Sequence, residues 1–146
     1  MLKHSHKHTI GLAGELLRRG IMAAVTYGNA KKGDVFAING KLAASLEVKS
    51  TSQTKWILGG ELPADNSNLW VLVHLPENET ESPEYFILTS AELRKLVLPK
   101  HEAYNEKYRE KHGKDFSGKA VFSIQREFLN DSYLGAWGKV RVALGI

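Results

Sequence analysis

Three residues of the chain could act together on a phosphate: Asp34, Glu47 and Lys49. Two carboxylates that lie close together repel each other unless a cation sits between them. Hard oxygen ligands with open coordination positions suit Mg²⁺ or Mn²⁺. A lysine beside such a pair can position or deprotonate a water molecule, and it can neutralise charge that develops on a phosphate. These residue types predict a divalent-metal site if the fold brings them together.

The segment 34–49 is typical of a β-hairpin. Asn39-Gly40 is the strongest short hairpin signal in the chain, because both residues accept the positive φ angles of a two-residue turn. This turn sets Ile38 opposite Lys41, and counting back along the two strands sets Asp34 opposite Ser45.

The predicted register puts the three reactive side chains on one face of the hairpin. Side chains alternate along a strand, so Glu47 and Lys49 share the side of Asp34. Asp34 lies diagonal to Glu47, at about 7–8 Å between backbone positions. Leu46 and Val48 point the other way, toward the core. The structural alternative is an edge hairpin in which Lys49 forms a cross-strand salt bridge with an acidic residue.

The other segments predict an α/β (α+β) fold with one mixed sheet of about five strands, flanked by helices. The chain is expected to form a single domain. Residues 1–7 should be a flexible tail, at which the alternating His4, His6 and His8 begin, and residues from about 99 to 146 should form a C-terminal helical part. In chain order we expect a helix over 12–20, strands over 21–27, 34–38, 41–49, 69–75 and 85–88, a helix from Thr89 to about Leu98 that Pro99 ends, a charged helix to about His112, and short helices over 123–128 and 131–144.

Composition narrows the class of protein. The chain has 146 residues, ordinary globular composition and no cysteine, which excludes a disulfide scaffold, a thiolate zinc site and a cysteine nucleophile. No apolar run is long enough to cross a bilayer, and no apolar signal-peptide core follows the first residues. A cytoplasmic protein without a membrane partner is expected.

Basic residues are concentrated in the first part of the chain. Residues 1–60 hold nine Lys or Arg against three acidic residues, whereas residues 61–146 hold eleven against thirteen. The first part is the better candidate for meeting a polyanion, although such side chains also serve as ordinary solvated surface. Trp56 is expected to pack over the sheet rather than to stack on a base, and Trp70 to lie in the core. The candidate phosphate contacts are Arg18, Arg19, Lys31, Lys32, Gln53 and Lys55.

The reactive residues resemble the motif of the PD-(D/E)xK nuclease superfamily, which has the restriction-endonuclease-like fold. The matching positions are Asp34, the run Glu47-Val48-Lys49 and the upstream pair Gly14-Glu15. The approach over residues 26–31 and the strand over 47–51 look like a small endonuclease-like branch related to Holliday-junction resolvases. The resemblance runs from about His8 to Leu98, and more weakly over residues 120–137.

The resemblance implies a metal-dependent endonuclease that hydrolyses phosphodiester bonds in DNA. Asp34 and Glu47 would ligate Mg²⁺ or Mn²⁺, with the Val48 carbonyl as a third ligand. Lys49 would hold or activate the attacking water, and Glu15 would contact the water shell of the metal. DNA is the implied partner. A homodimer is one implied arrangement, because two strands need two active sites, although the sequence shows no clear dimer face.

The chain departs from the family pattern in two places. Gly33 precedes Asp34 where the pattern has proline. Glu15 is followed at once by residues 16–20, where the pattern has about two more helical turns. Either about seven residues are missing, or Glu15 matches a later glutamate and Thr9 sits in the active register. A non-catalytic DNA-binding module that retains the fold is therefore the main alternative, and a small interaction domain is a third.

Overall fold

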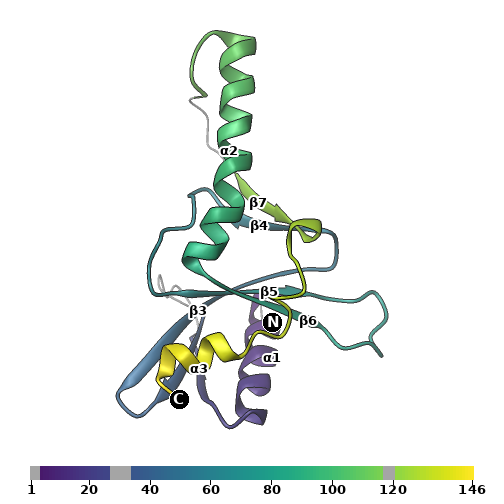
Figure 1. The fold of residues 1–146 in the computed structure, drawn as a ribbon. Coiled ribbons are helices and arrows are strands. Elements are labelled where there is room, and N and C mark those ends of the chain that lie inside the picture. The colour runs from purple at the N-terminus through teal and green to yellow at the C-terminus, as the bar shows by residue number, and fades with distance from the viewer. Residues whose placement is uncertain (1–3, 27–33, 117–120) are drawn as a thin grey trace.

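The computed structural model describes residues 4–26, 34–116 and 121–146 (Figure 1). Its helices and strands are α1 (His4–Arg18), β1 (Met22–Val25), β2 (Val35–Asn39), β3 (Leu42–Thr51), β4 (Lys55–Gly59), β5 (Leu69–His74), β6 (Glu84–Thr89), α2 (Ser90–His112), β7 (Phe122–Gln125), the 3₁₀ turn η1 (Arg126–Phe128) and α3 (Gly138–Leu144). Within these ranges, no helix is both long and apolar enough to cross a membrane.

The centre of the fold is a mixed five-stranded sheet, in the order β1-β2-β3-β5-β6. β1, β2 and β3 run antiparallel to one another, β3 pairs with β5 in parallel, and β5 pairs with β6 antiparallel. The predicted mixed sheet of five strands flanked by helices is confirmed. The sequence did not predict β4 or β7, which pair antiparallel as a second, two-stranded sheet.

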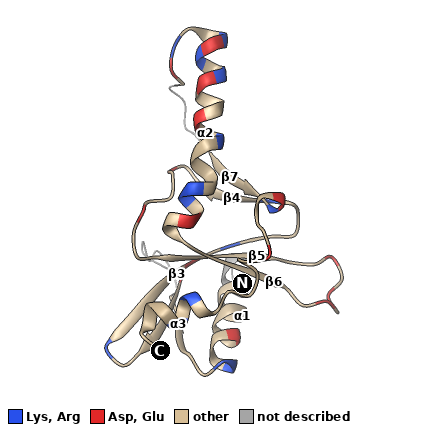
Figure 2. Ribbon diagram, in the orientation of Figure 1, with Lys and Arg blue, Asp and Glu red and all other residues tan. Residues whose placement is uncertain are grey.

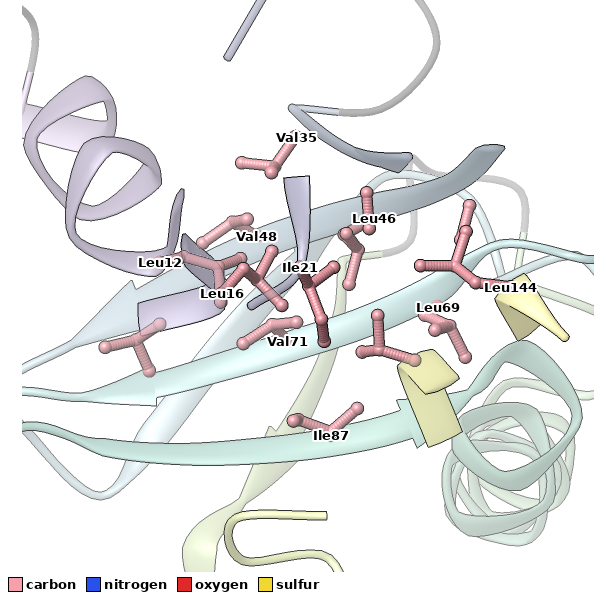
Figure 3. Packing of buried hydrophobic residues seen from close by; sticks show 14 residues of the cluster. Leu12, Leu16, Ile21, Val35, Leu46, Val48, Leu69, Val71, Ile87 and Leu144 are labelled. Atoms are coloured by element: carbon pink, nitrogen blue, oxygen red, sulfur yellow. The ribbon is translucent and has the colours of Figure 1, made fainter. Parts of the chain in front are cut away.

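Each face of the central sheet is covered by different elements. α1 and α3 lie against one face, where Leu12, Leu16 and Leu144 pack on Leu46 and Val71 (Figure 3). The other face meets α2 and the β4–β7 pair, on the opposite side of the sheet in Figure 1. Strand residues that point to α1 therefore cannot share a site with those that point to α2, and this decides which side chains can act together.

The first helix is longer than expected. α1 begins at His4, so residues 4–7 are helical and the predicted flexible tail is wrong for them. Thr9, Leu12, Ala13 and Leu16 recur at helical spacing and are buried, which extends the sheet-facing stripe about one turn before the expected start at Leu12. The predicted end at Gly20 is confirmed by its positive φ of 77°.

Pro99 does not end the second helix. α2 runs unbroken from Ser90 to His112, with Thr89 as N-cap in the predicted capping box and Gly113 as left-handed C-cap. Proline removes the hydrogen bond to the carbonyl four residues earlier, at Lys95. Both Pro99 and Lys95 are exposed, so water can satisfy that carbonyl. The outer half of α2 projects from the rest of the molecule, with acidic and basic residues along it (Figure 2).

The C-terminal part is less helical than predicted. The segment 123–128, predicted as a helix, contains the end of β7 and the short turn η1. Phe122 and Ile124 alternate with less buried residues and pack beside Trp56, which is the period of a strand and not of a helix. Helix α3 occupies only the last half of the predicted span 131–144.

Candidate functional site

The β2–β3 hairpin turns one residue later than predicted. Asn39 pairs with Leu42, so Gly40 and Lys41 form the turn, and Ile38 lies opposite Ala43 instead of Lys41. Gly40 supplies the positive φ, 58°. The Asn39 side chain is occupied elsewhere, because its Nδ2 donates a hydrogen bond to the Leu144 carbonyl at the end of α3, at 3.0 Å. The predicted register was therefore wrong: each β2 residue pairs with a β3 residue two positions later than predicted. Because this shift is an even number of residues, every side chain stays on its predicted face.

Asp34 lies at an irregular point immediately before β2. Its backbone N–H donates to the Leu46 carbonyl at 2.9 Å, although Val35 is the residue paired with Leu46. Such a bulge re-aims the side chain at a strand end. The Asp34 Oδ2 accepts a hydrogen bond from the Val48 backbone N–H at 2.9 Å. The carboxylate thus lies against the peptide that joins Glu47 to Val48. The predicted register had placed Asp34 diagonal to Glu47, and so farther from it along the strand.

Glu47 and Lys49 project from the same face of β3. They are half-buried and alternate with the buried residues Leu46 and Val48, which face α1. In the parallel register Glu47 pairs with Trp70 on β5. Among the residues that the structure describes, the Lys49 ammonium has no hydrogen-bond or ion-pair partner, so the cross-strand salt bridge of the structural alternative is not formed there. The ammonium is available to a bound group.

The donor set around the hairpin is small. Two carboxylates, of Asp34 and Glu47, flank the Val48 main chain. Within 4–26, 34–116 and 121–146, no three His, Cys, Asp or Glu side chains gather closely enough to hold a metal. Zinc centres and calcium cages need more protein ligands than this, whereas Mg²⁺ commonly takes one or two carboxylates and keeps several waters. The residues present fit Mg²⁺ or Mn²⁺ with a largely hydrated shell.

Glu15 lies on the other side of the sheet. Its carboxylate pairs with Arg18 at 3.1 Å and with Arg19, within α1. The hydrogen bond from Arg19 lowers the pKa of Glu15 below its ordinary value; burial opposes this shift and Arg18 adds to it. Burial raises the pKa of Tyr85, and the charge of Glu15 raises it further. Tyr85 packs in the α1-side core, so Glu15 lies on the face opposite Glu47, and the structure does not bring it to the hairpin.

Glu15 instead lines a surface hollow of about 440 Å³ between α1, the start of β6 and the segment before α3. Arg19 lies over the Trp137 ring there, 4.1 Å from its centroid, and its carbonyl accepts a hydrogen bond from Arg141. Arg19 therefore joins α1 to the C-terminal segment. Arg18 is exposed beside it, on the same side of the sheet.

The other predicted phosphate contacts fall in two places. Lys31 and Lys32 lie outside the described residues. Gln53 and Lys55 are exposed. They lie where the chain leaves the C-terminal end of β3, beyond Lys49, and enters β4. Of the predicted contacts that the structure describes, Gln53 and Lys55 follow directly on the hairpin strand, and Arg18 and Arg19 do not.

Trp56 and Trp70, two of the three tryptophans, differ in environment, and the prediction for Trp70 was wrong. Trp56 is fully buried and its Nε1 donates to the Val73 carbonyl at 3.0 Å, so it packs over the sheet as predicted. Trp70, predicted as core, is only partly buried and lies opposite Glu47. Thr9 is 3 % exposed on the sheet-facing side of α1. The signal that would have placed Trp70 is the parallel pairing of β3 with β5, which a single sequence does not give.

Comparison with known proteins gives a likeness of fold. No family model matches the chain, and no curated protein sequence matches it. Among solved structures, the chain is similar to Hjc, a Holliday junction resolvase from the archaeal hyperthermophile Archaeoglobus fulgidus. The two are 14% identical, with a TM-score of 0.49 over 86% of this chain and 87% of that chain.

Proposed function

We propose that this protein is a metal-dependent endonuclease that hydrolyses phosphodiester bonds in DNA. One observation carries the proposal: the hydrogen bond from the Val48 N–H to the Asp34 carboxylate, which sets that carboxylate beside the strand that bears Glu47 and Lys49. Carboxylates that share a site repel each other unless a cation lies between them, so Asp34 and Glu47 on one side of the hairpin support a cation site there.

Each residue has a distinct part in the proposed reaction. Asp34 and Glu47 would hold Mg²⁺ or Mn²⁺, with the Val48 carbonyl as a neighbouring ligand. The ion, when bound, supplies an acidified water and polarises the scissile phosphate. The Lys49 ammonium would hold the attacking water and offset the charge that develops on the phosphate. Water is added across one P–O bond, which yields a phosphate monoester and a free hydroxyl.

The second candidate is a DNA-binding module without catalysis. It is favoured by the small donor set, because the described residues offer no third acidic ligand at the hairpin. Glu15, which the family resemblance would add to the site, is paired with arginines on the other face. Both candidates share DNA as partner, and only turnover separates them.

Nicking of supercoiled plasmid in Mg²⁺, and separately in Mn²⁺, tests the proposal. Wild type should nick the plasmid, and Asp34→Asn and Lys49→Ala should not. Lys107→Ala is the matched control, because Lys107 is an exposed lysine on the projecting half of α2. Duplex, branched, single-stranded DNA and RNA should be compared in the same buffers.

The outcomes are distinct. Hydrolysis that is lost in Asp34→Asn and Lys49→Ala but kept in Lys107→Ala supports the nuclease. Binding of DNA by wild type without hydrolysis of any of these substrates supports the second candidate. Equal hydrolysis by all four proteins contradicts the assignment of the site to the hairpin.

A further inference from the structure

A second polar cluster lies at the end of the sheet to which β3 leads: His74, Glu84 and Arg126, here called the β3-end cluster. Arg126 Nη2 donates to Glu84 Oε1 at 2.6 Å, and His74 Nδ1 lies 3.3 Å from the same oxygen. His74 and Glu84 pair across β5 and β6, and Arg126 opens η1. Three segments distant in sequence therefore place these side chains together.

The β3-end cluster shares a face with Lys49. Lys49 pairs with Leu72 in the parallel register and Thr51 pairs with His74, so Lys49, Thr51 and His74 point to the same side of the sheet. Thr51 lies two residues beyond Lys49, about 7 Å along the strand at about 3.3 Å per residue.

The surroundings hold Arg126 in place and leave it accessible. Its backbone N–H donates to the Thr54 carbonyl at 2.8 Å, in the segment that follows β3, and its guanidinium lies 5.8 Å from the centroid of the Phe86 ring. The side chain is 43 % exposed. A guanidinium carries five N–H groups. Within the described residues only Nη2 has a side-chain acceptor, so the other donors are free to meet a ligand.

The segment between β3 and β4, beside the β3-end cluster, has no acidic residue, whereas the exposed Glu127 directly follows Arg126 in η1. Residues 52–55 are Ser, Gln, Thr and Lys, and all four are exposed. Lys55 adds a positive charge next to Arg126, while Glu84 is engaged by Arg126 and His74. An anion approaching from solvent meets a preoriented guanidinium and several hydroxyl and amide donors, which is the chemistry that binds a backbone phosphate.

We infer that Arg126, oriented by Glu84 and His74, binds a backbone phosphate of the substrate strand on the same side of the sheet as Lys49. The inference rests on the proposed nuclease function and extends its substrate track from the hairpin to the far end of β3. Arg126 is the phosphate ligand, and Glu84 is a positioning residue. The alternative is a purely structural role, here called a tether, in which the Arg126–Glu84 ion pair only joins η1 to β6.

Binding of a short fluorescein-labelled DNA duplex by the full chain, in EDTA so that no hydrolysis occurs, tests the inference. Arg126→Gln should weaken binding about tenfold and lower the slope of log affinity against log salt by about 1, as expected for one lost phosphate contact. Arg109→Gln is the matched control, because Arg109 also forms an exposed ion pair, with Asp115 at 2.8 Å, but on the projecting half of α2. It should bind as wild type does.

Glu84→Gln should change the DNA affinity in the opposite direction from Arg126→Gln. The amide oxygen can still accept from Arg126 while the negative charge beside the phosphate is removed, so binding should tighten several-fold. A tether predicts no tightening. If Arg126→Gln shows no cooperative unfolding transition, the binding result for Glu84→Gln alone tests the inference. The Glu84→Gln change keeps the hydrogen bond to Arg126 and so preserves the fold.

Two results would overturn the inference: unchanged affinity and salt slope in Arg126→Gln, or unchanged or weaker binding in Glu84→Gln. Plasmid nicking by wild type that still depends on Asp34 would then leave the proposed function standing. Conversely, DNA binding that depends on Arg126 without any nicking would support the β3-end cluster and contradict the nuclease.

Discussion

The carboxylate of Asp34 accepts a hydrogen bond from the backbone N–H of Val48, 2.9 Å away. This contact joins the residue that precedes β2 to the middle of β3, across the part of the hairpin that carries Glu47 and Lys49. It uses one carboxylate oxygen, and within the part of the chain that the structure describes the other oxygen has no hydrogen-bond partner. The structural and the proposed chemical roles of Asp34 can therefore be separated by the choice of substitution.

Asp34→Asn and Asp34→Ala should differ in stability and agree in activity. The Asn side-chain oxygen can still accept from Val48, so the free energy of unfolding should stay within about 0.5 kcal/mol of wild type. Ala leaves that partly buried N–H without its acceptor and should cost about 1 kcal/mol. Both variants should lose nicking, because neither supplies a charged ligand. Urea denaturation and the plasmid assay measure the two effects, and nicking by Asp34→Asn would contradict the metal-binding role.

Glu92 should make the fold sensitive to acid. Burial alone would raise the pKa of Glu92, but hydrogen bonds from the Thr89 backbone and from Lys139, at 3.0 Å, hold that pKa below its ordinary value of 4.5. Because the pKa is lower in the folded state, ionised Glu92 stabilises the fold above pH 4.5, and this contribution is lost as the pH falls through the folded pKa.

Glu92→Gln isolates that charge, because glutamine can keep the capping box with Thr89. It should lower the free energy of unfolding by about 0.5–1 kcal/mol at pH 7, since both ion-pair partners are partly exposed. The difference from wild type should shrink as the pH falls below 4.5 and vanish once the pH is below the folded pKa of Glu92. Urea denaturation at the two pH values checks this, and a difference that persists in acid would assign the effect to packing.

Pro99→Ala should stabilise the protein. Alanine restores the N–H that the Lys95 carbonyl lacks inside α2, and proline in a helix interior costs about 3 kcal/mol relative to alanine. Since the site is exposed and water already meets the carbonyl, a gain of about 1–2 kcal/mol is expected. The midpoint of thermal unfolding measures it. A lower midpoint would mean that proline shapes α2 for its packing on β6 and β7.

The sequence predicts the local elements of the central sheet well, because they depend on short-range chemistry. The positive φ at Gly20 and the capping box at Thr89 are local and were confirmed. The face shared by Glu47 and Lys49 follows from alternation, which survives an even shift in register.

What the sequence missed depends on distant partners. In the observed hairpin register, the Asn39 side chain bonds to the Leu144 carbonyl, 105 residues later, and the sequence gives no sign of this contact. Within the segment 123–128, the residues up to Gln125 belong to β7, which pairs with β4 from a distant part of the chain. The β3-end cluster follows from the pairing of β5 with β6 and from the contact of η1 with β6, and the position of Trp70 beside Glu47 follows from the parallel pairing of β3 and β5. No local propensity encodes such pairings. Their free energy depends on the entropy lost when the intervening loop closes and on the burial gained in the tertiary structure.

Glu47 and Glu15 form a matched pair that tests which face of the sheet is active. Both are half-buried glutamates, and each can be changed to glutamine without altering its volume. Glu47→Gln removes a proposed metal ligand beside Lys49, so nicking should fall by about 100-fold or more, the scale of one lost electrostatic group in a phosphate-transfer site. Glu15→Gln should leave nicking within about twofold, since its carboxylate is paired with Arg18 and Arg19 on the α1 side.

The effect of Glu15→Gln should appear in stability instead. The pKa of Glu15 is lowered in the folded state, so its ionised form stabilises the fold above its unfolded pKa, and that stabilisation is lost as the pH falls through the folded pKa. Wild type should therefore be modestly more stable than Glu15→Gln at pH 7 and equally stable in strong acid. A loss of nicking in Glu15→Gln, at unchanged stability, would mean that the substrate or the metal brings α1 into the site, and the assignment of catalysis to the Glu47 face alone would be wrong.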